Sequence, residues 1–279
     1  MKRMLKFEMK RLFGRKELYI AILIGSVLSV WLALQSAMLL QTQAQLLADA
    51  PVEDAAYFFL PSVFNKFIGI DHAALPTTIL FALFPILAVF PYATTYAEDI
   101  TSGYIKNVIV RTSKKTYYLA KFIVTIFSGF FVLCAVFAVS IFFTTMLLPQ
   151  IMPQVTAFTF PAASNYALWS NIYRTTPYLY LLLYSFLDAV FYGFFATIAL
   201  GLSSFIKRRF VIIIIPTVLF FASTYFFGYL NSWTWMPELF LRQYQPTFVK
   251  LWIILTEMFI IAAAGTLTFF FVGEKKNVL

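Results

Sequence analysis

Charged residues are scarce in this sequence, and histidine and cysteine are almost absent. Only 12% of the 279 residues are Asp, Glu, Lys or Arg, whereas an ordinary soluble domain has about 25%. Hydrophobic residues make up 61%, which is more than a single soluble core of this size can bury. Lipid is the natural solvent for the excess. The composition therefore predicts one membrane domain rather than one or two soluble domains.

The rare residue types exclude several kinds of site. His72 is the only histidine, so a metal site built on two histidines is excluded. Cys134 is the only cysteine, so no disulfide forms within the chain, and its apolar surroundings favour a packing role. The sequence has no Gly-x4-Gly-Lys-Ser/Thr loop to hold the phosphates of ATP. We therefore expect no catalytic residue, metal site or cofactor in this chain, which would not be an enzyme by itself.

Six apolar stretches are long enough to cross a bilayer as helices, which takes about 20 residues. The predicted fold class is therefore an all-α membrane protein with six transmembrane helices. The longer third and fourth stretches predict tilt or extension beyond the lipid, and Pro85, Pro91 and Pro216 predict kinks. The six predicted spans are 18–40, 76–97, 119–148, 177–203, 211–230 and 251–272.

Positive charge sets the predicted orientation. Of the 21 lysines and arginines, 17 lie on the side that holds the N-terminus and the 273–279 tail, and four lie on the other side. The basic side of a membrane protein is cytoplasmic, so both termini are predicted inside. Because these residues cluster beside the spans, the net charge of +9 does not indicate nucleic-acid binding. The segments predicted to lie outside could form either short helices that dip into the interface or ordinary loops with an aromatic belt.

Residues 1–17 predict an amphipathic helix that lies in the headgroup region, attracted by anionic lipid. A disordered basic leader is the alternative. Phe7 falls among the basic residues, so the pattern is imperfect. The apolar residues with helical spacing are Met1, Met4, Leu5, Met9, Leu12 and Phe13.

The cytoplasmic loop 98–118 is too polar to span a membrane, yet it contains a short apolar helical face. Gly103 permits a sharp turn before this face, and Asp99 or Thr101 could cap a helix start. Such a helix is suited to dock into a groove of a soluble partner; a solvated loop that only fixes orientation is the alternative. The apolar residues of the face and its flanks are Tyr104, Ile105, Val108, Ile109 and Val110.

A family resemblance rests on this loop. Its pattern is Glu98, then Gly103-Tyr-Ile-Lys-Asn107, then Arg111, Ser113, Lys115 and Lys121. It resembles the loop after the second helix of ABC-2 type permeases, above all the bacitracin and lantibiotic export or immunity branch. There the loop commonly has an acidic residue, Gly-Thr-Ile/Leu-Lys-Asn, Arg or Ser, and a Lys. Tyr104 departs from the usual Thr. In outline the resemblance extends over the basic N-terminal helix, the six spans and the cytoplasmic termini.

The resemblance implies partners and a mechanism. Such permeases work in pairs in the bacterial plasma membrane, among membrane lipids, with two cytoplasmic ABC ATPase subunits that bind ATP and Mg. The second permease subunit is a copy or a related chain. Loop 98–118 would be the coupling helix, with Ile105, Val108 and Ile109 in the ATPase groove and Glu98 and Lys106 at its rim. The implied interface is Glu98, Asp99, Gly103, Tyr104, Ile105, Lys106, Val108, Ile109 and Arg111.

Two acidic residues fall inside predicted spans. Asp188 has Tyr184 and Tyr192 one turn away on the same face of the fourth span. Ionisable residues inside membranes often line a pathway, but Asp188 could also be bonded to a phenol and only tie helices together. Glu257 in the sixth span lies about 9 Å from its outer end at 1.5 Å per residue. It could line the outer mouth of a pathway, pair with outer basic residues or extend outward.

The predicted function is that of the membrane subunit of an ABC exporter for an amphipathic or hydrophobic molecule. Export of a peptide or antimicrobial, or immunity to it, is the sharpest version and rests on the resemblance. One alternative is a non-transporting membrane immunity or interaction protein, which needs no ATPase. Another is an ion-driven secondary transporter, in which Asp188 is essential.

Overall fold

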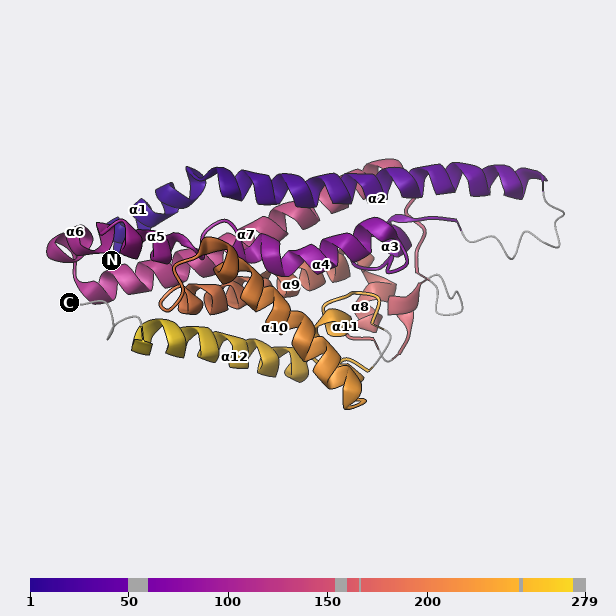
Figure 1. Ribbon diagram of the computed structural model, residues 1–279. Helices are drawn as coiled ribbons and strands as arrows, with labels where there is room; N and C mark the ends of the chain where they lie inside the picture. Colours follow the sequence, from indigo (N-terminus) through magenta and orange to yellow (C-terminus); the bar gives the residue numbers. More distant parts are fainter. Residues whose placement is uncertain (50–59, 154–159, 166, 246–247, 273–279) are drawn as a thin grey trace.

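The computed structural model of the protein describes residues 1–49, 60–153, 160–165, 167–245 and 248–272. These residues form a bundle of long helices with shorter helices at both ends (Figure 1). The chain is an α-helical, multi-pass membrane protein, as its composition predicts. Five helical stretches of the described residues are long and apolar enough to cross a membrane: α2 (Lys16–Asp49), α7 (Lys114–Leu147), α9 (Pro177–Leu202), α10 (Arg209–Tyr229) and Leu251–Phe271, which begins with α12 (Leu251–Leu267).

The stretch predicted as the second span, 76–97, is not one helix. It divides into α4 (Leu75–Val89) and α5 (Thr95–Thr101), separated by a turn. Pro91 lies in this turn and has no amide hydrogen to donate to the carbonyl four residues earlier. At 15 residues, α4 is about 23 Å long, which is less than the roughly 30 Å of a hydrocarbon core.

Two helices are much longer than a bilayer requires. Helices α2 and α7 have 34 residues each, which corresponds to about 51 Å. The C-terminal end of α2 extends past the rest of the bundle (Figure 1). The extension of α7 agrees with the length of the third predicted span, whereas α2 continues well beyond the predicted boundary at residue 40.

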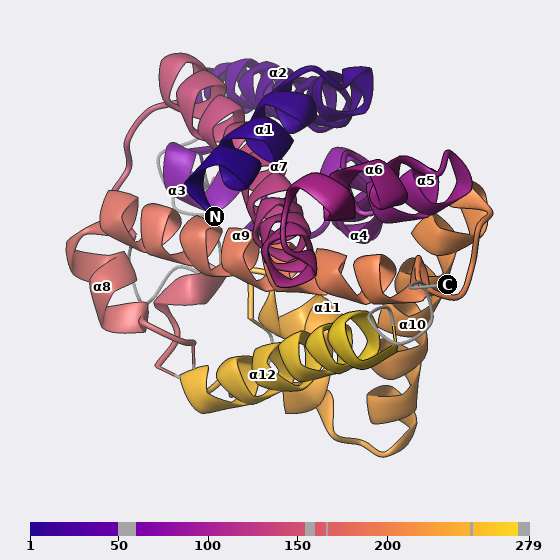
Figure 2. The ribbon, with the colours of Figure 1, turned by 90° about the vertical axis from the view of Figure 1, so that its left-hand side faces the viewer.

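Helix α9 is the centre of the bundle. It contacts α4, α7, α10 and α12, and in the end view of Figure 2 it crosses between α7 on one side and α12 on the other. Within an apolar 18-residue segment of each helix, 61% is buried in α9, but only 28% in α10 and 28% in the α12 stretch. Helices α10 and α12 therefore leave most of their apolar surface uncovered by the rest of the chain, while α9 fills the core.

Short helices gather at the two ends of the bundle. One end holds α1 (Lys2–Phe13), α5, α6 (Tyr104–Arg111) and the C-terminal end of α12 (Figure 1). The other holds α3 (Val63–Lys66), α8 (Ser170–Thr175) and α11 (Pro237–Phe240). Single turns of tighter helix cover Pro161–Ala163 and Trp233–Trp235, and a wider helical turn covers Thr268–Val272.

The outer segment after α11 folds into the bundle. The side chains of Phe240, Leu241, Gln243 and Gln245 are fully buried, and the Tyr184 hydroxyl of α9 donates to the Phe240 carbonyl. Irregular backbone at membrane depth is tolerated only where protein or a water-filled cavity covers it. The described part of this segment is therefore packed inside the bundle rather than exposed as a loop on its surface.

Candidate functional site

A buried charge cluster lies at the end of the bundle that holds α1, α5 and α6. Helix α1 contributes to it because Met4, Glu8 and Leu12 recur every four residues and share one buried face. Glu8 is thus an acid in the middle of an apolar stripe. The predicted N-terminal helix is present, but the structure packs this face against α7 of the same chain, and it ends at Phe13.

The centre of the cluster is an ion-paired lysine. The Nζ of Lys121, which is fully buried, lies 2.8 Å from an Oδ2 of Asp99 and 3.1 Å from an Oε2 of Glu8. It also donates to the Thr95 hydroxyl at 3.2 Å. The hydroxyl of Tyr117 donates to Asp99 at 2.5 Å, and the hydroxyl of Tyr92 donates to Glu8. Both carboxylates therefore have a cation and a phenol as partners.

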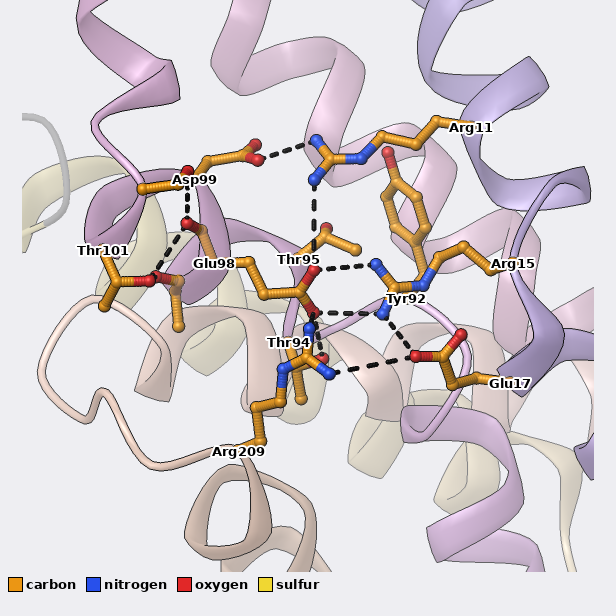
Figure 3. A network of polar contacts seen from close by, with 12 residues as sticks. Arg11, Arg15, Glu17, Tyr92, Thr94, Thr95, Glu98, Asp99, Thr101 and Arg209 are labelled. Carbon is orange, nitrogen blue, oxygen red and sulfur yellow. Dashed lines mark hydrogen bonds and ion pairs between the residues drawn. The ribbon is translucent and has the colours of Figure 1, made fainter.

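Arginines extend the cluster toward the surface (Figure 3). Arg11 of α1 lies 2.7 Å from Asp99. Arg15, in the connection between α1 and α2, donates to both oxygens of Glu98 at 2.9 and 3.0 Å and to Glu17 at 2.9 Å. Arg209 at the start of α10 lies 2.7 Å from Glu98. Glu98 thus joins the α1–α2 connection to α10.

The ionisation of the outer groups follows from these contacts. Burial by itself raises the pKa of the Glu98 carboxyl, but the hydrogen bonds and charge of Arg15 and the charge of Arg209 lower that pKa below its ordinary value. Burial opposes the charged form of Arg11, yet the charge and hydrogen bond of Asp99 raise the pKa of the guanidinium above its ordinary value. Arg15 is shifted in the same direction by Glu98 and Glu17. All three groups are therefore charged at neutral pH.

The charges of the cluster balance. Its acids are Glu8, Glu17, Glu98 and Asp99, and its bases are Arg11, Arg15, Lys121 and Arg209. Such a network does not guarantee high stability, because desolvation of each ion opposes the attraction between them. Its geometric consequence is that α1, α2, α5, α7 and α10 meet at one set of polar contacts. Among the described residues, no group of three or more His, Cys, Asp or Glu side chains could hold a metal.

Helix α6 follows this cluster directly. Gly103 adopts a left-handed conformation with φ of 70°, which a glycine adopts without a steric penalty, and this turn directs α6 away from α5. The structure corrects the predicted orientation of α6. Ile105 is only 4% exposed and packs within its own chain in an apolar group with Met4, Tyr96 and Tyr117, rather than facing a partner.

The remaining residues of the predicted coupling interface divide into two groups. Asp99 is 1% exposed and belongs to the interior of the cluster, so its assignment to a partner surface is wrong. Val108 and Ile109 are half-buried beside Ile105. The exposed face of α6 comprises Lys106, Asn107, Val110 and Arg111. Glu98 is partly accessible but is already held by arginines of its own chain.

A groove lies between α1 and α6. Its volume is about 610 Å³, and it is lined by Met4, Phe7, Tyr104, Asn107, Val108, Val110, Arg111 and Thr112. Val110 is 87% exposed and Phe7 is half-exposed, so apolar side chains are accessible at its edge. The guanidinium of Arg11 lies 5.5 Å from the centre of the Tyr104 ring, which connects the groove wall to the charge cluster.

The residues of the predicted pathway do not form one site. Asp188 is buried in α9, and neither of its carboxyl oxygens has a hydrogen-bond partner among the described residues. Tyr184 bonds instead to the Phe240 carbonyl and to Gln245, and the Tyr192 hydroxyl is also unpaired in the described part of the chain. Glu257 of α12 lines a separate apolar pocket.

Sequence reasoning missed most of the charge cluster. Glu8, Arg15 and Glu17 do not stand out in the sequence, and Lys121 enters only through the loop pattern. Two signals pointed to the centre of the cluster. Glu8 interrupts the Met4–Leu12 stripe, and Lys121 lies inside the predicted span 119–148, where an ionisable residue indicates a buried partner. Arg209 was interpreted only as a topology signal.

Comparisons with curated proteins and with solved structures found no match. Residues 64–278 match the sequence profile of the family described as "Protein of unknown function (DUF2705)". The match includes Glu98, Asp99, Lys121 and Arg209 of the charge cluster, the whole of α6 and the pocket around Glu257. Because it covers more than half of the chain, this protein belongs to that family of unknown function.

Proposed function

We propose that this chain is the membrane subunit of an ABC exporter in the bacterial plasma membrane. A separate cytoplasmic ATPase would bind ATP and Mg, and a second permease subunit would complete the membrane part. The single observation that supports this proposal best is the arrangement of α5 and α6. A short helix with an exposed face follows directly from a helix whose two carboxylates are ion-paired to α1, α7, α10 and the connection between α1 and α2.

This arrangement suits the transmission of force. A partner that pushes or pulls on α6 acts on α5 through only two residues, Ser102 and Gly103. Helix α5 is in turn fixed through Glu98 and Asp99 to α1, α7 and α10. Packed interiors transmit small displacements because they have few voids. ATP-driven movement at α6 would therefore reach several membrane helices together.

The proposed topology has six crossings with both termini in the cytoplasm. In it, the second crossing is 76–97, which comprises α4, the turn at 90–94 and the first residues of α5. The support comes from the position of α6, which lies at the same end of the bundle as α1, whereas α2 ends at the opposite end (Figure 1). The excess of Lys and Arg at the end with α1 and α6 supports a cytoplasmic position for that end.

The decisive experiment is co-expression with candidate ATPases, followed by purification of the tagged chain in mild detergent. The exposed face of α6 can be altered without touching the core, because Val110 is 87% exposed. We expect Val110→Asp to abolish co-purification of the ATPase and its stimulation by amphipathic peptides or lipids. Leu46→Asp is the matched control, since Leu46 is also exposed but lies near the far end of α2.

Two results would contradict the proposal. The exporter interpretation fails if no ATPase accompanies the wild-type chain, or if Val110→Asp leaves both the complex and its ATPase activity intact. A chain that still protects cells from a peptide in the absence of any ATPase would instead be a non-transporting immunity protein.

One observation favours a second candidate, an ion-driven secondary transporter. Asp188 is 1% exposed, and its carboxyl oxygens have no hydrogen-bond partner among the described residues. A buried acid without a partner is expensive in a membrane and is often functional. This candidate predicts that Asp188→Asn abolishes transport and that transport does not require a bound ATPase. Dissipating the ion gradient at constant ATP separates the two mechanisms, because only the secondary transporter stops.

A further inference from the structure

An apolar pocket of about 240 Å³ lies between α9, α10 and α12. Phenylalanine rings contribute from two helices, with Phe191 and Phe195 from α9 and Phe220 and Phe227 from α10. Trp235 and Pro237 close one end. The charge cluster lies elsewhere and none of its residues lines this pocket, so the two features are structurally independent.

The pocket contains one acidic group. The side chain of Glu257 lines it and is 8% exposed. Its Oε1 atom is buried and has no hydrogen-bond partner in the part of the chain that the structure describes. No described lysine or arginine forms an ion pair with it. A buried carboxylate without a partner is costly, and a cationic ligand would remove that cost.

The pocket is reached from the side of the bundle rather than from its end. Leu219 of α10 and Ile260 of α12 line it, and both side chains are about half-exposed. In a membrane these outward surfaces of α10 and α12 face the lipid. A ligand dissolved in the bilayer therefore has a direct route between the two helices, and a strongly hydrophilic ligand does not.

We propose that this pocket binds an amphipathic amine taken from the bilayer. Its cationic nitrogen lies against the Glu257 carboxylate, and its apolar body lies among Phe191, Phe195 and Phe220. The aromatic faces add attraction for the cation, while the apolar walls exclude water and strengthen the ionic contact. This inference rests on the proposed export function, for which it names a substrate class, but the binding itself requires no ATPase.

The ligand chemistry leads to a charge-specific test. The chain is purified alone into lipid nanodiscs, and binding of para-fluorophenylbutylamine is measured by fluorine NMR line broadening against empty nanodiscs. The matched alcohol, para-fluorophenylbutanol, has the same apolar body without the charge. We expect the amine to bind at least about tenfold more tightly than the alcohol, since a charge contact in a partly buried site readily supplies one decade of affinity.

Two variants locate the site. Glu257→Gln keeps the side-chain volume and removes the charge, so it should weaken amine binding about tenfold and leave alcohol binding unchanged. Ser223→Leu adds volume inside the pocket and should weaken both ligands. Asp49→Asn removes one negative charge at the far end of α2, where Asp49 is exposed, and should change neither affinity.

Other outcomes overturn the inference. It fails if the wild-type chain binds the amine no better than empty nanodiscs do, if amine and alcohol bind equally, or if Glu257→Gln retains full amine affinity. It also fails if Ser223→Leu leaves both affinities unchanged. Because these measurements use no ATPase, a negative result does not bear on the Val110→Asp test of the exporter proposal. Conversely, absence of a bound ATPase would overturn the exporter proposal but would say nothing about amine binding in the pocket.

Discussion

Lys121 is the residue on which the charge cluster depends most. Its ammonium group is fully buried and lies within 3.1 Å of both Glu8 and Asp99. Moving one ion out of water costs several kcal/mol even after relaxation, and only close partners offset that cost. The two carboxylates have the same requirement, so each member of this trio is stable inside the protein only because the others are present.

Replacing Lys121 by methionine should therefore destabilise the protein strongly. The variant leaves Glu8 and Asp99 buried without their shared cation, and loss of one partner of a buried pair costs about 3–5 kcal/mol. The free energy of unfolding can be measured by SDS titration in mixed micelles. Lys115→Met on the same helix is the control, because Lys115 is exposed and surface substitutions usually change stability by less than about 0.5 kcal/mol. Equal effects of the two substitutions would show that the ion pairs contribute nothing.

His72 provides a pH dependence in the opposite end of the molecule. Its ring stacks on Tyr244 with centroids 3.7 Å apart. Although His72 is exposed overall, partial desolvation lowers the pKa of the imidazole below its ordinary 6.5; Asp71 opposes this, whereas the charges of Arg242 and Lys66 act in the same direction. The unfolded chain therefore takes up the proton first as the pH falls. The stability that His72 contributes is present above pH 6.5 and is lost as the pH falls below it.

His72→Phe tests this pH dependence, because it keeps an aromatic ring beside Tyr244 and removes the titration. Thermal unfolding between pH 7.5 and 5.5 should show a larger loss of stability for the wild-type chain than for the variant. Since His72 is the only histidine, the difference between the two curves belongs to this residue. Parallel curves would contradict the predicted direction of the pKa shift.

At the scale of elements, a close helix crossing joins α7 to α9. A Cβ atom added at Gly193 of α9 would lie 2.9 Å from the backbone oxygen of Ile126, and one added at Gly129 of α7 would lie 3.0 Å from the backbone oxygen of Tyr192. The glycines thus allow the two backbones to approach closely. Small residues commonly have this role in membrane proteins, where helix association depends on packing rather than on water.

Gly193→Ala should therefore weaken the fold, because the neighbouring atom is backbone and the helices must separate to accommodate the methyl group. Gly228→Ala in α10 is the matched control. A Cβ there meets only the flexible side chain of Met236, at 3.6 Å, so the higher helix propensity of alanine should stabilise that variant by up to about 1 kcal/mol. The SDS unfolding assay distinguishes them, and a Gly193→Ala protein as stable as wild type would rule out a tight crossing.

Helices could be predicted from the sequence where a continuous apolar run marks them. Hydropathy located α2, α7, α9, α10 and the α12 stretch because each has a continuous apolar run. It failed at 76–97, where Pro91 and the polar Thr94 and Thr95 fit a turn and a second helix that an averaged window does not resolve. Periodicity found the apolar face of α6 but could not tell that Met4 and Tyr96 of the same chain cover Ile105.

At the scale of the whole molecule, the charge cluster shows why sites can be harder to predict than helices. Glu8 and Arg209 are separated by some 200 positions, and no local spacing connects them. They belong to one network because α5 lies between them: Lys121 pairs with both Glu8 and Asp99, and Arg209 pairs with Glu98, a contact drawn in Figure 3. Orientation, by contrast, is predicted from charge counts because it depends on a sum over the chain rather than on particular contacts.

The six-crossing topology can be tested with thiol chemistry, since Cys134 is the only cysteine. In a Cys134→Ser background, single cysteines are placed at Asp49, Asn107 and Asn171. The predicted topology puts the first and third outside and Asn107 in the cytoplasm. A membrane-impermeant maleimide should label Asp49→Cys and Asn171→Cys in intact cells, and Asn107→Cys only after permeabilisation.

The position at Asn107 decides whether α4 and α5 cross the membrane. The 15 residues of α4 span about 23 Å, which is less than the roughly 30 Å hydrocarbon core. The turn and α5 must therefore supply the remaining depth. If they do not cross, α6 remains on the same side as the end of α2, and Asn107→Cys is labelled in intact cells together with Asp49→Cys. That result would place α6 out of reach of any cytoplasmic ATPase, and it would overturn the proposed coupling mechanism together with the topology.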